Sequence, residues 1–174
     1  MKKNIYYFVL ILITVFVFTL LYKAIFQNNS YIPSSKINKK INNFSASTLF
    51  LDNKINIKDL ILKKKITIIN IWASWCAPCR SEHEYLMKLK EHPNIVLIGL
   101  NYKDKPSKAK LFINDFGNPF STILKDPKGI ISIEIGAYGV PETYILDGNL
   151  ILKKKFIGEL TFKNFEEIIE IANR

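Results

Sequence analysis

The chain contains only two cysteines, Cys76 and Cys79, and they are separated by two residues. They lie where a run of apolar, β-branched residues, Ile66–Trp72, gives way to a helix-like pattern. Unpaired N–H groups and the positive end of the dipole at a helix start favour thiolate over thiol. A Cys-x-x-Cys pair at such a junction can also close a disulfide across one helical turn. The pair therefore predicts a redox-active dithiol.

In this interpretation Cys76 is the exposed nucleophile, which attacks a partner's disulfide, and Cys79 lies deeper and resolves the mixed disulfide. Covalent haem attachment would require a histidine directly after the second cysteine, but that position holds Arg80. A zinc site would require four ligands, and only His83 and His92 could join the cysteines, with His83 expected on the exposed helix surface. We therefore expect no metal and no cofactor other than the disulfide.

The elements around the cysteines predict an α/β fold. Ile66–Trp72 is typical of a strand buried on both faces, and Pro78 fits the first turn of the following helix, expected over 80–91. Alternating strands and helices predict a mixed sheet with helices on both faces. The other expected elements are a hairpin of 48–51 with 54–57, a helical turn at 59–62, strands at 95–100 and 120–124, a helix at 107–116, Ile130–Ile135 as helix or strand, a hairpin of 143–146 with 150–156, and a helix at Phe162–Ala172.

The N-terminus predicts a membrane anchor. Residues 5–22 form an apolar stretch without a charge or a proline. This stretch is long enough to span a bilayer as a helix, and it is longer than a typical signal-peptide core. Lys2 and Lys3 precede them and favour a cytoplasmic amino terminus, although Lys23 and the basic tract at 36–40 on the other side weaken this bias. We expect residues 1–23 to be an uncleaved single-pass membrane anchor in preference to a removed signal peptide, 24–43 to be a polar tether, and 44–174 to be a domain outside the cytoplasm.

The formal net charge of +10 raises the question of nucleic-acid binding. The lysines are dispersed or lie in short runs, and no nucleic-acid-binding motif accompanies them. We therefore expect no nucleic-acid partner.

The segment around the cysteines resembles the active site of the thioredoxin superfamily, and more specifically that of the membrane-anchored DsbE/CcmG thiol:disulfide interchange proteins. This resemblance covers roughly residues 44–174 and implies a thioredoxin-like fold with an N-terminal hairpin and a central insertion around 105–135. The segments that carry it are 72–80 (WASWCAPCR), 80–83 (RSEH), 99–104 (GLNYKD), 116–120 (FGNPF) and 136–143 (GAYGVPET).

The resemblance also implies a cis peptide bond between Val140 and Pro141 that faces the dithiol. Ordinary thioredoxins carry an aspartate six residues before the first cysteine, where this chain has Asn70, which cannot titrate. Glu82 and Glu142 are therefore the candidate proton acceptors, since a carboxylate near the sulfurs would raise the thiol pKa and could accept a proton.

Both glutamates also have plainer interpretations: Glu82 as a solvated helix residue and Glu142 as a strand-edge residue. Arg80 is either a substrate contact or a solvated residue of the first helical turn. We expect the catalytic residues to be Cys76, Cys79, Glu82 and Glu142, and the substrate-binding residues to be Trp75, Pro78, Arg80, Val140 and Pro141.

The function implied by the resemblance is reduction of a disulfide in apocytochrome c, or in a thiol protein of cytochrome c maturation, before haem attachment. A membrane electron donor of the DsbD/CcdA type would then reduce the protein again. One alternative is a TlpA/ResA-type anchored reductase of another envelope pathway. Another is a non-catalytic module that binds a polypeptide or haem.

Overall fold

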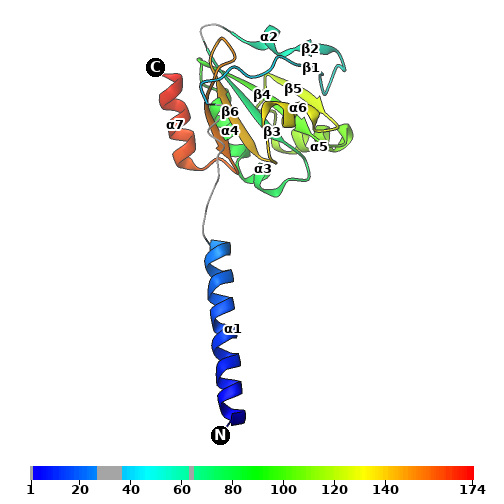
Figure 1. The fold of residues 1–174 in the computed structure, drawn as a ribbon. Coiled ribbons are helices and arrows are strands. Elements are labelled where there is room, and N and C mark those ends of the chain that lie inside the picture. Colours follow the sequence, from blue (N-terminus) through cyan, green and yellow to red (C-terminus); the bar gives the residue numbers. More distant parts are fainter. Residues whose placement is uncertain (1, 27–36, 63–64) are drawn as a thin grey trace. The chain divides into compact units, whose positions relative to one another are not determined.

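A computed structural model of the chain describes residues 2–26, 37–62 and 65–174 (Figure 1). The chain divides into two compact units, residues 1–33 and 34–174, and each is described by itself. In chain order the helices and strands of the described residues are α1 (Lys2–Phe26), β1 (Ser45–Ser47), β2 (Lys54–Asn56), α2 (Ile57–Leu60), β3 (Ile66–Trp72), α3 (Ala77–Ser81), α4 (His83–Lys90), β4 (Ile95–Tyr102), α5 (Pro106–Phe116), β5 (Thr122–Asp126), α6 (Ile130–Ile135), β6 (Glu142–Leu146), β7 (Leu152–Ile157) and α7 (Phe162–Ala172).

The first unit contains the apolar helix α1. Its stretch Lys3–Lys23 is 21 residues long and carries its charges only at the ends, and its side chains are exposed. At 1.5 Å per residue this stretch is about 30 Å long, which equals the hydrocarbon thickness of a bilayer. The hydroxyl groups of Thr14 and Thr19 donate to Leu10 O and Phe16 O, so these polar atoms are satisfied within the helix. By length and composition α1 can cross a membrane.

The second unit is an α/β domain, as the sequence predicted, and it has the thioredoxin-like fold that the resemblance implied. Its five-stranded sheet has the order β5-β4-β3-β6-β7. β3 pairs in parallel with β4 and antiparallel with β6, so the sheet is mixed. β3 has the predicted bounds and is buried along almost its whole length, because strands flank it on both sides and helices cover both faces. The dithiol follows directly after this central strand.

Two clusters of apolar side chains fill the two faces of the sheet. The first joins the strands to α3, α4, α5 and α7, and both cysteines belong to it. The second joins the strands to α2, α6 and the β1–β2 hairpin. In Figure 1, α7 lies at the left of the domain and the β1–β2 hairpin at its top. The alternation of side chains along β3 decides which residues face the cysteines: Ile68 and Trp72 do, while Ile69 and Ile71 face the other layer.

The domain begins earlier than the predicted boundary at residue 44. Part of the predicted tether, residues 27–36, lies outside the described residues. Residues 37–43 pack on the domain instead of forming a tether, since Asn38 N donates to Leu152 O at 2.8 Å and Ile41 is buried. The isoleucines in this polar run supply the apolar contacts, which composition alone did not reveal.

The N-terminal hairpin also differs in its first strand. β1 is Ser45–Ser47 and pairs antiparallel with β2. Residues 48–51, the predicted first strand, form most of the connection between the two strands.

The helix predicted over 80–91 is two helices that meet at Glu82. α3 begins earlier, at Ala77, and α4 ends at Lys90. Glu82 keeps helical backbone angles, and its N–H bonds back to Pro78 O at 3.1 Å. At this junction of the two helices the Glu82 side chain is buried in the domain.

We predict that Gly99→Ala destabilises the domain. Gly99 lies opposite Asn70 in the sheet, and a Cβ atom there would approach Trp72 Nε1 to 2.8 Å and Phe120 Cδ2 to 2.9 Å. Both rings are buried and stacked on each other, so neither can move freely. The free energy of unfolding in urea should fall by about 1–3 kcal/mol, the usual cost of overpacking.

The matched control is Gly139→Ala, because a Cβ atom at Gly139 meets no heavy atom within 4 Å. This substitution should change stability by less than about 0.5 kcal/mol. Equal losses in the two variants would contradict the packing argument.

Candidate active site

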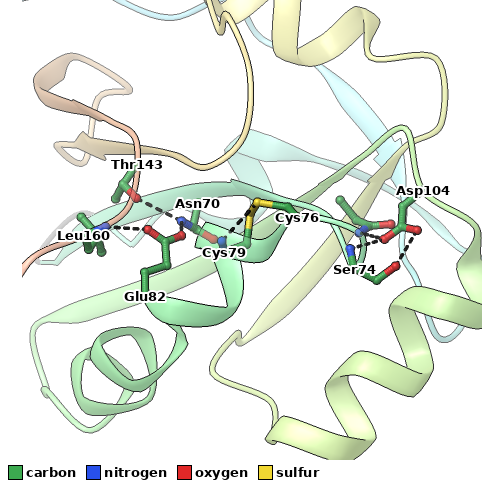
Figure 2. Close-up of a disulfide and its surroundings, with 9 residues drawn as sticks. Asn70, Ser74, Cys76, Cys79, Glu82, Asp104, Thr143 and Leu160 are labelled. Carbon is green, nitrogen blue, oxygen red and sulfur yellow. Dashed lines mark hydrogen bonds between the residues drawn. A yellow bond between two sulfur atoms is a disulfide. The ribbon is translucent and has the colours of Figure 1, made fainter. Parts of the chain in front are cut away.

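Cys76 and Cys79 form a disulfide at the junction of β3 and α3 (Figure 2). Cys76 is the N-cap residue of α3, and its Sγ accepts a hydrogen bond from Cys79 N at 3.1 Å. Pro78 occupies the first turn, where its missing N–H leaves no bond unmade. The same N–H that contacts the sulfur in the disulfide can stabilise a Cys76 thiolate after reduction.

Both cysteines are buried, with 4% of Cys76 and 2% of Cys79 exposed. The prediction that Cys76 is exposed is therefore wrong for the oxidised form. Its bond to Cys79 and its contact with the start of the helix hold the Cys76 sulfur against the first turn of α3.

The predicted substrate-binding residues differ in their exposure. Trp75, Pro78 and Arg80 are exposed, Val140 is half-buried and Pro141 is buried. Val140 packs against the cluster that contains both cysteines, and the Val140–Pro141 peptide bond is cis, as the resemblance implied.

Arg80 does not simply extend into solvent. Its guanidinium group lies 4.9 Å from the centre of the Phe116 ring, at the end of α5. A planar cation over an aromatic ring is attracted by the ring's electrons, which fixes the direction of the side chain. Arg80 thus contributes an oriented positive charge to the exposed surface beside α3.

Glu82 is fully buried one turn after Cys79. Its Oε1 accepts from Asn70 Nδ2, and its Oε2 accepts from Leu160 N, both at 2.8 Å (Figure 2). Burial raises the pKa of Glu82 to about 7, and the bonds from Asn70 and Leu160 lower the pKa by less. The solvated interpretation of Glu82 is therefore excluded. A carboxyl group with this pKa can accept or release a proton near neutral pH.

Asn70 connects the two central strands to Glu82. Its Nδ2 also donates to Thr143 Oγ1 at 3.0 Å, across the β3–β6 pair. With both amide hydrogens engaged, Oδ1 is buried and has no partner among the described residues. The Asn70 amide therefore acts as a hydrogen-bond donor to Glu82, and its own oxygen is the acceptor that stays unpaired among the described residues.

Glu142 lies on the other face of the sheet. It pairs in register with Ile71, whose side chain belongs to the second apolar cluster. Its Oε2 is 2.8 Å from the buried Lys155 Nζ and accepts from Tyr144 Oη, and its Oε1 accepts from the N–H groups of residues 138 and 139. The structure therefore does not bring Glu142 together with Glu82 and Asn70. A catalytic role for Glu142 stays a prediction, while its contacts hold the turn before Pro141.

Two residues that the sequence did not assign to the site are Ser74 and Asp104. The backbone N–H and hydroxyl of Ser74 both bond to the Asp104 carboxylate, on the side of the disulfide away from Glu82 in Figure 2. Asp104 is the last residue of the segment 99–104, which carries the resemblance, and it lies two residues after the end of β4. This position was the one sequence feature that could have assigned Asp104 to the site. What the sequence could not supply is the contact across 30 residues.

His83 is buried and not exposed as predicted. Its Nε2 lies 3.1 Å from Gly117 O, and its ring packs edge-on against Phe112 and Phe116. Burial lowers the pKa of His83, so the neutral imidazole is favoured. Across the described part of the chain, no three His, Cys, Asp or Glu side chains gather in a way that could hold a metal ion.

Comparison with known proteins places these features in a family. The sequence profile described as Redoxin matches residues 33–169. A thiol:disulfide interchange protein DsbE from Pasteurella multocida is 35% identical over 98% of this chain and 94% of its own length. A protein of the same name from Escherichia coli is 34% identical over 80% of this chain and 75% of its own length.

Solved structures agree on the fold. A DsbF homologue from Corynebacterium diphtheriae superposes with a TM-score of 0.66 at 27% identity, covering 76% of this chain and 86% of that one. A secreted Mycobacterium tuberculosis disulfide oxidoreductase homologous to E. coli DsbE superposes with a TM-score of 0.63 at 17% identity, covering 75% of this chain and 94% of that one.

We predict that Glu82 makes stability pH-dependent. Its folded pKa of about 7 lies above its ordinary value of 4.5, so folding disfavours the ionised form. Its contribution to stability is fully present below pH 4.5 and is lost as pH rises through 7, by about 3 kcal/mol in total. Urea unfolding of the oxidised protein at pH 4.5 and pH 8 measures this loss. Glu82→Gln should remove most of it, and an unchanged pH dependence in this variant would refute the assignment.

We also predict that Lys155→Met is strongly destabilising. It would leave the Glu142 carboxylate buried without its cation, at a cost of about 3 kcal/mol. The matched control is Lys154→Met on the same strand, because the Lys154–Glu167 pair is exposed and should contribute less than about 1 kcal/mol. Urea titration of both variants at neutral pH measures the two losses in the free energy of unfolding. Similar losses would mean that the buried pair does not stabilise the domain.

Proposed function

Because the chain belongs to the Redoxin family and is a thiol:disulfide interchange protein of the DsbE type, we propose that it reduces disulfides of apocytochrome c, or of a thiol protein that handles it. The observation that carries the proposal is a disulfide at a helix start, one turn before a buried acid whose pKa is about 7. Such a site can pass two electrons and store the accompanying proton.

The proposed reaction begins with the reduced dithiol. The Cys76 thiolate attacks one sulfur of the partner's disulfide, and the other partner sulfur leaves as a thiolate and takes up a proton. Cys79 then loses its proton, and its sulfur attacks Cys76 Sγ and breaks the mixed disulfide. The second partner sulfur leaves as a thiolate. The partner has gained two electrons, and the protein holds the Cys76–Cys79 disulfide.

Glu82 is proposed to accept the Cys79 proton. It lies one turn further along from Cys79 and is shielded from water, so a proton released there has few other acceptors. While ionised, its negative charge also opposes a second negative charge on the thiol, which delays thiolate formation until a partner has docked. The exposed residues Trp75, Pro78 and Arg80, with Val140 and Pro141, are proposed as the surface that the partner's chain contacts.

The proposed location is the periplasmic face of a bacterial inner membrane, with α1 as the anchor. The length of α1 and the lysines before its apolar stretch support this. A membrane dithiol donor of the DsbD/CcdA type would return two electrons to the disulfide, so the protein works as a reductant. A reduction potential above about −150 mV for the Cys76–Cys79 pair would reverse this direction.

We predict that Cys79→Ala traps the partner. Without the resolving thiol, the mixed disulfide through Cys76 should persist and carry apocytochrome c or a maturation thiol protein, identified by mass spectrometry after non-reducing electrophoresis. Deletion of the gene should abolish haem-stained c-type cytochromes, and Cys76→Ser should fail to restore them.

The double variant with Cys76→Ser and Cys79→Ala is the control, since it lacks the attacking sulfur and should trap nothing. Normal levels of c-type cytochromes in the Cys76→Ser strain would contradict the proposed substrate. If other envelope proteins were trapped in their place, the activity would belong to a different pathway.

A further inference from the structure

The Asp104 carboxylate is the centre of a hydrogen-bonded cluster beside the disulfide. Oδ2 accepts from Ser74 N at 2.6 Å and from Asn101 Nδ2 at 3.0 Å. Oδ1 accepts from Ser74 Oγ at 2.9 Å and from Lys105 N at 2.8 Å. A carboxylate has about four acceptor sites, so this one is saturated. Figure 2 shows the Ser74 side chain and the Asp104 carboxylate pointing toward each other.

The cluster continues to Trp75. The indole Nε1 of Trp75 donates to Lys103 O at 3.2 Å. Lys103 has a φ of +43°, an uncommon conformation for a residue other than glycine, and its N–H is held by Asp126 O at 3.0 Å. The segment after β4 therefore holds both the backbone before Trp75 and the Trp75 ring.

These contacts matter because the connection between β3 and α3 is short. Residues 73–76 link the central strand β3 to α3, so the helix contains Cys79 and this connection contains Cys76. Within it, the Cys76 N–H bonds to Ala73 O at 3.2 Å, and Ser74 is fixed by Asp104. Trp75 lies between Ser74 and Cys76, and 58% of it is exposed. A large exposed ring beside a buried sulfur is a surface that a polypeptide must contact to reach that sulfur.

We propose that Asp104 is a positioning residue for macromolecular substrates: it fixes Ser74 and the Lys103 carbonyl, and so holds the Trp75 ring where a protein partner docks beside Cys76. The four hydrogen bonds of its carboxylate go to Ser74, Asn101 and Lys105, and none goes to a sulfur. It therefore acts on docking and not on the chemistry of the thiol. The proposal needs only the thiol:disulfide interchange activity and holds whichever protein is the natural substrate.

The test compares a protein disulfide with a small one. Asp104→Asn keeps the shape but turns an amide NH₂ group toward the donors Ser74 N or Lys105 N, so at least one bond is lost. With the reduced full-length chain in detergent micelles, the rate constant for insulin reduction should fall about tenfold, as expected when a docking element is misplaced. The rate constant with 5,5′-dithiobis(2-nitrobenzoate) should stay within about twofold, because this small disulfide needs no docking surface.

A spectroscopic readout reports the ring directly. The Trp75 indole N–H resonance, assigned through Trp75→Phe, should shift in Asp104→Asn, and the Trp72 resonance should not. Ser74→Ala removes only the hydroxyl bond and should give a smaller change of the same kind, which keeps the test usable if Asp104→Asn fails to fold.

Asp147→Asn is the matched control, because this carboxylate also caps a turn, by accepting from Asn149 N and Ile151 N, away from the dithiol. It should leave both rate constants and the Trp75 resonance unchanged. An equal fall of both rate constants in Asp104→Asn, or an unchanged insulin rate constant in Asp104→Asn and Ser74→Ala alike, would overturn the proposal.

Discussion

The structure of this site depends on one constraint: the carboxyl group of Glu82 is buried near a disulfide, and within the described part of the chain two hydrogen bonds hold it. Burying an acid raises the free energy of its charged form, and the domain satisfies it with donors from two distant places, the Asn70 amide and the backbone N–H of Leu160. The turn between α3 and α4 is where the chain directs the carboxyl group inward. The central strand, the active-site helix and the segment before α7 are thereby joined at one point next to Cys79.

The connection that carries Cys76 is fixed from both sides. On one side Glu82 and Asn70 define the surroundings of the inner sulfur, inside the core. On the other side Asp104 holds the loop at Ser74, near the surface. The first set of contacts is suited to proton transfer, and the second to presenting a docking surface. In the proposed mechanism, this short connection therefore separates proton transfer from docking, because different neighbouring segments serve each of the two.

Local sequence patterns predicted much of this fold for physical reasons. The apolar run of β3, the cysteine spacing and the amphipathic α7 are local properties, and their bounds agree with the structure. The predicted helix over 80–91 missed its break because nothing local reveals that Glu82 is needed inside the core. His83 was misplaced for the same reason, since its partner, Gly117, is 34 residues away. Glu142 was placed near the sulfurs by its sequence position, whereas the alternation of side chains along β6 sends it to the opposite face.

The absence of an acid at position 70 has a physical consequence. An aspartate there would lie within hydrogen-bonding distance of Glu82, and two carboxylates so close would titrate as a coupled pair, one of them strongly raised in pKa. Asn70 instead donates to Glu82 and lowers its pKa toward neutrality, against the effect of burial. A single acid with a pKa of about 7 can exchange a proton near neutral pH, and the Asn70 amide that bonds to it also bonds across to Thr143 on β6. The asparagine therefore lowers the raised pKa that burial gives Glu82, and it joins β3 to β6 through its bond to Thr143.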